Sequence, residues 1–280
     1  MTHSAATHNW NALTSFKHLG EAIAAENDSS LSYGSEFKKG TSLSPIFGRH
    51  PLWPRLYNIL AQGISFPLQD LSYEQRRRDT IEGLQFGNHK GATKHEKLFL
   101  KLFTKDIIHG YSLVIPTDKI LDIHGALLAP LNIVEQSTID ETGAVVPAQR
   151  LTHNQSKVFH ASNTSVNGTV IKEALQDCMY GHCIIRCLHY IAALRLKHPS
   201  TRILVQKVDY KSAYRRAHLT WQTAIQTITQ VTDNLSQIAL RATFGGAPNP
   251  HAKSSSLHIN TWYLLTVSLM TKPPSNKHYP

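Results

Sequence analysis

Hydrophobic residues recur at helical spacing in two segments of the first half of the chain. Between Trp53 and Gly63, apolar residues three and four positions apart predict a short amphipathic helix that the glycine ends. A second apolar face covers Lys97–Ile108. Between them, residues 71–84 predict a mostly polar helix that carries Arg76-Arg77-Arg78, a run more typical of a solvated helix face than of a binding site.

From residue 111 onward the pattern changes to short apolar runs broken by proline. Residues 111–116 and 131–134 are typical of strands, and Thr142-Gly143 predicts a β-turn before Val145-Val146. We therefore expect a small sheet to follow the helices.

The second half of the chain predicts a long helix and then a buried strand. Met179–Lys197 carries an apolar stripe and ends just before Pro199, and residues 203–208 form an apolar run that ends at Asp209. A last helix is expected within Ser255–Met270. Together these elements predict an α+β fold, with both helices behind a small antiparallel sheet that carries Asp209 at a strand end.

The chain divides into three parts by composition. Residues 1–48 are rich in small polar residues and are expected to be mostly disordered. Residues 49–142 form a helical and mixed leader region, and residues 143–280 form the domain that carries the chemical motifs.

Charge separates the same regions. Residues 1–142 hold 14 Lys and Arg against 15 Asp and Glu, whereas residues 143–280 hold 15 against 4, a net charge of +11. A basic half of this kind favours a polyanionic partner, nucleic acid before membrane. No stretch resembles a secretion signal or a membrane span, so an intracellular protein is expected, in nucleus or cytoplasm.

A cluster of cysteine and histidine offers a competing interpretation, a structural metal site in an unrelated helical protein. Its members lie close in sequence: Cys178, His182, Cys183, Cys187 and His189. The paired C-x-x-C spacing of zinc sites is absent, and one straight helix cannot surround a tetrahedral ion. Small thiols on an apolar helix are the better explanation.

The most informative segment is residues 207–219, KVDYKSAYRRAHL. It places a carboxylate, Asp209, at the end of an apolar strand, followed by an aromatic residue and two arginines. Metal-assisted phosphoryl transfer needs such hard oxygen ligands on a rigid element. The segment resembles the first catalytic motif of reverse transcriptases, Asp-x-x-x-Ala-Tyr.

Two further segments carry the same resemblance in the same order. Arg150-Leu151-Thr152-His153-Asn154-Gln155-Ser156, with Ser165-Val166-Asn167 after it, resembles the fingers segment of retroelement polymerases. Residues 240–248, LRATFGGAP, resemble the later Gly-x-x-x-Pro region. Residues 143–280 thus resemble reverse-transcriptase fingers and a partial palm.

The resemblance implies a role for each matching residue. Asp209 would be the first catalytic aspartate and, with the backbone carbonyl of Tyr210, would bind Mg²⁺ or Mn²⁺. The incoming deoxynucleoside triphosphate would meet four residues: Arg150, Tyr214, Gly245 and Gly246. The RNA or DNA template-primer would meet four basic residues: Lys207, Lys211, Arg215 and Arg216.

The chain also departs from the family pattern. The fingers aspartate is replaced by Asn154, and no Asp or Glu follows Asp233, so the family's later Asp-Asp pair is missing. Two-metal catalysis needs carboxylates from both places. We therefore expect a truncated, inactive polymerase fragment that self-associates or pairs with a longer polymerase chain. The alternative is a domesticated basic protein that binds nucleic acid without catalysis.

Overall fold

The computed structural model describes residues 3–16, 21, 40–140, 142–161, 164–175, 183–203 and 213–249. Its helices are α1 (His3–Ser15), α3 (Gly40–Phe47), α4 (Trp53–Gln62), α5 (Tyr73–Phe86), α6 (Lys90–Lys94), α7 (Glu96–Ile108), α8 (Cys183–Lys197) and α9 (Trp221–Ala224). Its strands are β1 (Ser112–Pro116), β2 (Leu131–Ile139), β3 (Val145–His153), β4 (Thr229–Gln230) and β5 (Leu235–Ala239). Short 3-10 turns are η1 (Thr117–Asp122), η2 (Asn167–Thr169), η3 (Lys172–Ala174), η5 (Ala213–Arg216) and η6 (Ile225–Thr227).

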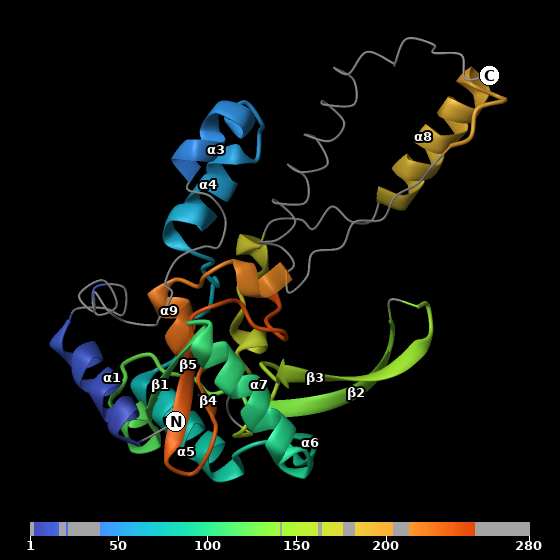
Figure 1. Cartoon of the computed structure of the whole chain (residues 1–280). Coiled ribbons are helices and arrows are strands. Elements are labelled where there is room, and N and C mark those ends of the chain that lie inside the picture. Colours follow the sequence, from blue (N-terminus) through green and yellow to red (C-terminus); the bar gives the residue numbers. More distant parts are fainter. Residues whose placement is uncertain are drawn as a thin grey trace.

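Two small antiparallel sheets combine with these helices, which confirms the α+β class (Figure 1). One sheet has the strand order β1-β5-β4, and the other is the β2-β3 hairpin. In the first sheet Ser112 lies opposite Ala239 and Pro116 opposite Leu235. The sheet therefore joins the leader region to a segment more than a hundred residues later in the chain.

Strand β1 is buried on both faces and separates two hydrophobic clusters. Leu113 and Ile115 belong to the larger cluster, whereas Val114 belongs to the smaller one, which also contains Phe99 and Phe103 of α7. The alternation follows from the two-residue period of a strand. Each large apolar side chain buried in this way stabilises the fold by about 1.5–3 kcal/mol.

Helix α1 differs from the disorder expected over residues 1–48. Its Ala6 and Leu13 are buried, and the Asn9 side-chain amide donates a hydrogen bond of 2.8 Å to the Val114 carbonyl oxygen. The prediction of disorder was wrong at His3–Ser15. A few apolar residues are enough to hold this helix in place because the edge strand β1 supplies the surface against which it packs.

The hairpin of β2 and β3 confirms the predicted turn at Thr142-Gly143. The Asp140 carboxylate accepts hydrogen bonds from the backbone N–H groups of Thr142 (2.9 Å) and Ala144 (3.0 Å). Gly143 has a φ of +85°, which glycine adopts without strain. The hairpin extends from a buried base to an exposed tip (Figure 1).

The predicted long helix is present as α8, but its packing differs from the expectation. Leu188, part of the predicted apolar stripe, is 59% exposed, and Leu196 is exposed as well. Within the described residues, α8 therefore does not bury this stripe behind the sheet. Residues 204–212, which include Asp209, and the helix expected within Ser255–Met270 lie outside the described residues. No helix in the described ranges is both long and apolar enough to cross a membrane.

Candidate functional site

The segments predicted to form the fingers and the Gly-Pro region meet at the side chain of Asn167. Its amide nitrogen donates to the Ser156 hydroxyl and to the Gly245 carbonyl oxygen, both at 2.9 Å. Its amide oxygen accepts from the Ala247 backbone N–H at 2.8 Å. Its own backbone N–H donates to the Gln155 carbonyl at 2.8 Å. One residue thus connects both parts of the predicted fingers segment with the predicted Gly-Pro region.

A second set of hydrogen bonds joins the end of β3 to the loop at residues 243–249. The His153 N–H donates to the Phe244 carbonyl at 2.9 Å, and the Gln155 amide nitrogen donates to the Thr243 hydroxyl at 2.9 Å. The Asn249 amide nitrogen donates to the Thr243 carbonyl at 2.6 Å. The loop is therefore held by the protein itself, before any ligand binds.

The two glycines of this loop have different roles. Gly245 is exposed and has a φ of +132°, and a Cβ atom at this position would collide with the His153 carbonyl oxygen. Gly246 is buried, and its Cβ would lie 2.8 Å from an atom of Phe66. Both glycines were predicted to meet a nucleotide, but only Gly245 is at the surface, and the close approach it allows is to β3.

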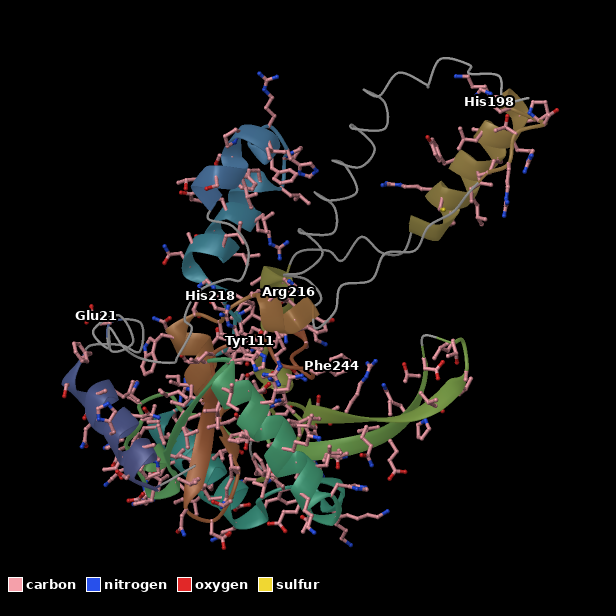
Figure 2. All side chains as sticks on the ribbon, viewed as in Figure 1. Glu21, Tyr111, His198, Arg216, His218 and Phe244 are labelled. Carbon is pink, nitrogen blue, oxygen red and sulfur yellow. The ribbon has the colours of Figure 1, made fainter. Side chains whose placement is uncertain are left out.

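A group of aromatic and basic side chains forms around Phe244 of this loop, with Arg150 exposed and Tyr214 half-buried. The Phe244 ring, 48% exposed, packs edge-on against Tyr214 with ring centroids 5.7 Å apart. The Arg150 guanidinium carbon lies 5.9 Å from the centre of the same ring. Figure 2 shows Phe244 near the base of the hairpin. Phe244 thus contacts both Arg150 and Tyr214, two of the predicted nucleotide contacts. No role was predicted for Phe244 from the sequence, although an aromatic residue directly before Gly-Gly could have indicated one.

Arg215 lies in an internal ion pair, although the sequence analysis assigned it to nucleic acid. Its guanidinium is 2.7 Å from the Asp106 carboxylate of α7, and the two side chains are only 19% and 15% exposed. Burial raises the pKa of Asp106, and the positive charge of Arg215 opposes that rise. This pair connects η5, which carries Tyr214, to the leader region, where no functional residue was predicted.

Two buried histidines, His153 and His218, lie close to Arg215 and Arg241 respectively. Burial lowers the pKa of His153 to about 3, helped by the charge of Arg215, and lowers that of His218 to about 4, helped by Arg241. Both rings are therefore neutral at pH 7. His89 is also held neutral, because burial and then Lys157 lower its pKa, and its Nε2 lies 2.9 Å from the Asn154 amide nitrogen. Asn154 thus donates to a neutral ring at the position where the family pattern has an aspartate.

The remaining predicted residues are outside the described part of the chain or are spread over it. Segment 204–212 lies outside the described residues and contains Asp209, Tyr210, Lys207 and Lys211. Segment 176–182 also lies outside them and contains Cys178 and His182. Arg216 ends η5, next to the Asp106–Arg215 pair. Cys187 and His189 are exposed on α8. Among the described residues, no group of three or more His, Cys, Asp or Glu side chains could hold a metal ion.

Comparisons with models of protein families, with curated proteins and with solved structures give no match to this chain.

Proposed function

We propose that this chain is a reverse-transcriptase-type fingers and partial palm that binds a nucleic-acid template-primer and a deoxynucleoside triphosphate. The observation that carries the proposal is the contact of the predicted fingers segment with the predicted Gly-Pro region at Asn167, in which residues 78 and 80 positions apart are hydrogen-bonded. The group of Arg150, Tyr214 and Phe244 supports it, because a cation beside aromatic rings suits a nucleotide.

We further propose that the chain binds without extending a primer. Asp209 is one carboxylate, and Mg²⁺ or Mn²⁺ held there would need a second acidic segment to form a two-metal centre. Residues 234–280 contain no Asp or Glu, so they do not supply that segment.

Primer extension tests the catalytic part of the proposal. The protein and its Asp209→Ala variant are incubated with an RNA template, a DNA primer and Mg²⁺ or Mn²⁺. We expect no extension by either protein. Extension by the wild type that disappears in Asp209→Ala would mean that the chain supplies its own second carboxylate, and the inactive assignment would be wrong.

Binding assays test the other part. We expect Lys211→Gln to weaken template-primer binding and to reduce the dependence of log affinity on log salt by about 0.9, the effect of one phosphate contact on a duplex. The matched control is Lys101→Gln, an exposed lysine on α7, which should leave both unchanged. Arg150→Gln should weaken the binding of a fluorescent deoxynucleoside triphosphate and leave template-primer binding unchanged. An affinity that does not respond to salt would contradict phosphate binding.

A further inference from the structure

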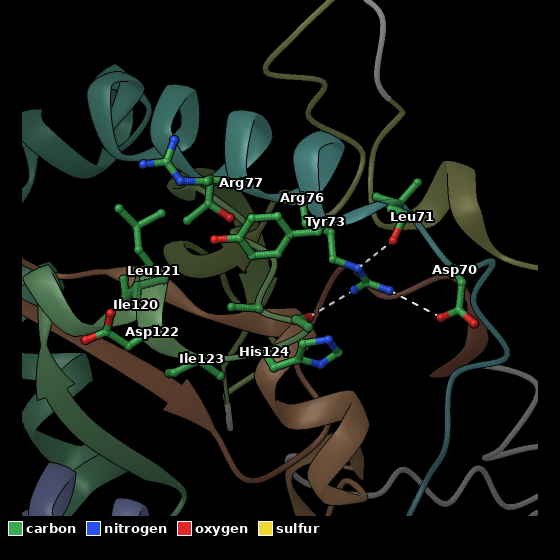
Figure 3. Close-up of a pocket in the computed structure, with 13 residues that line it drawn as sticks. Asp70, Leu71, Tyr73, Arg76, Arg77, Ile120, Leu121, Asp122, Ile123 and His124 are labelled. Carbon is green, nitrogen blue, oxygen red and sulfur yellow. Dashed lines mark hydrogen bonds and ion pairs between the residues drawn. The ribbon is translucent and has the colours of Figure 1, made fainter.

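A cavity of about 610 Å³ lies between the first half of α5 and the segment around η1, and it shares no residue with the site described above. Its walls come from Asp70–Thr80 on one side and Ile120–Ala126 on the other. This volume is within the range of small-ligand sites. Figure 3 shows Tyr73 and Arg77 on the α5 side, with Leu121, Ile123 and His124 facing them.

The frame of the cavity is held by Arg76. Its guanidinium donates to the Leu71 carbonyl at 3.1 Å and to the Gly125 carbonyl at 3.2 Å, and it pairs with Asp70 at 3.3 Å. These bonds link the two walls directly (Figure 3). Of the arginine triplet expected to be a solvated helix face, Arg76 therefore has only 15% of its side chain exposed and is hydrogen-bonded to both walls of the cavity.

Among the arginine and aspartate side chains that line the cavity, Arg77 is the one that forms no ion pair with the described residues. The Asp70 carboxylate is paired with Arg76, and the Asp122 carboxylate lies 3.9 Å from the Lys119 ammonium. Arg77 is exposed, and no partner for it lies among the described residues. Arg77 therefore offers an unpaired guanidinium at the cavity, while the Lys119 ammonium near Asp122 is shared with the Asp118 carboxylate at 3.6 Å.

Apolar and aromatic side chains line much of the rest of the cavity, together with Thr80 and His124. Tyr73 is 65% exposed although it lines the cavity, and Leu121 is exposed across from it. Ile120 and Ile123 are buried beneath them. An exposed ring above an apolar floor is a stacking surface for a flat, partly apolar group, and the nearby guanidinium is suited to a phosphate.

We propose that this cavity binds one unpaired nucleotide of a single-stranded nucleic acid, with its base against Tyr73 and its phosphate on Arg77. The inference rests on the proposed function, which supplies nucleic acid as the partner. It assigns the leader region a second contact with the strand, separate from the group of Arg150, Tyr214 and Phe244.

The test is titration of the full chain with a labelled single-stranded oligonucleotide. We expect Tyr73→Ala to weaken binding by about 5-fold to about 150-fold, the range for removal of a base-stacking aromatic. We expect Arg77→Gln to weaken it and to reduce the salt slope by about 0.7, the value for one contact on a single strand. A 2-aminopurine base in the oligonucleotide should be quenched by the wild type and less so by Tyr73→Ala.

Two matched controls separate the cavity from general charge and hydrophobicity. Arg78→Gln removes the same charge from the next residue of α5, which is exposed but does not line the cavity. Tyr190→Ala removes another exposed tyrosine, 55% exposed against 65% for Tyr73, from α8. Neither variant should change the salt slope or the quenching. Melting curves for all four variants should match the wild type, because each changed side chain is exposed.

The outcomes distinguish the inference from the proposed function. Suppose that the wild type binds template-primer and that Tyr73→Ala and Arg77→Gln bind the single strand with wild-type affinity. The cavity assignment is then wrong and the proposed function stands. If the wild type binds neither nucleic acid, both are wrong. If free deoxyadenosine monophosphate displaces the oligonucleotide at equal nucleotide concentration, the ligand is a mononucleotide and the assignment to a strand is overturned.

Discussion

Replacement of Gly245 by alanine is expected to disrupt the contact between the loop at residues 243–249 and the end of β3. The first penalty is in the backbone, because a φ of +132° is almost restricted to glycine and costs another residue about 1–3 kcal/mol. The second is steric, because the added Cβ collides with the His153 carbonyl oxygen. To relieve it, the loop must move away from the end of β3.

That movement breaks two hydrogen bonds, from the His153 N–H to the Phe244 carbonyl and from Asn167 to the Gly245 carbonyl. At about 1 kcal/mol each, they bring the expected loss in free energy of unfolding to about 3–5 kcal/mol. Urea unfolding followed by circular dichroism measures it as a shift of the midpoint at constant slope.

Gly143→Ala is the matched control for this experiment. Gly143 also has a positive φ, +85°, but nothing lies within 4 Å of an added Cβ. Its expected cost is therefore the backbone penalty alone, about 1 kcal/mol. If Gly245→Ala costs no more than Gly143→Ala, the close contact between the loop and β3 does not exist in solution, and the reasoning about the site fails.

Three other predictions concern titratable and charged groups. His153→Leu should make the loss of unfolding free energy between pH 7 and pH 5 smaller by about 2 kcal/mol. The folded pKa of His153, about 3, lies below the unfolded value of about 6.5, so protonation favours the unfolded chain in that window. Unchanged pH dependence in urea unfolding would contradict this prediction. Asp106→Asn should cost about 3 kcal/mol, since it leaves Arg215 largely buried without its carboxylate; a loss below about 0.5 kcal/mol would mean that the pair is solvated. Asn154→Asp should raise the pKa of His89, measured by NMR titration of the ring, and no change would mean that the two side chains are not in contact.

The elements that the sequence predicted correctly are those with local signals. Gly63 ends α4, and Lys97–Ile108 coincides with α7 to within one residue. The hairpin turn at Thr142-Gly143 could be predicted because Asp140, whose carboxylate accepts a hydrogen bond from the Thr142 N–H, lies only two residues before it. Periodicity and punctuation are local properties, so they can be read without knowledge of the tertiary structure.

The features that the sequence did not predict depend on distant partners. Nothing within α7 distinguishes Asp106 from a solvated acid, because its partner Arg215 lies far along the chain. The pairing of β1 with β5 is non-local in the same way. The motif spacing did select Ser156, Asn167 and Gly245, but their mutual hydrogen bonds became visible only in three dimensions.

The hydrogen bonds at Asn167 also determine when the site can form during synthesis. They join residues 78 and 80 positions apart, and the bond from Gln155 to Thr243 spans 88 positions. Closure of loops of this length is slow and is rewarded only after both ends are present. On the ribosome, the hairpin can fold from its own residues, whereas the site must wait until Ala247 has emerged. Until then the nascent chain exposes an incomplete site, because the partners of Asn167 at residues 245–247 have not yet been made.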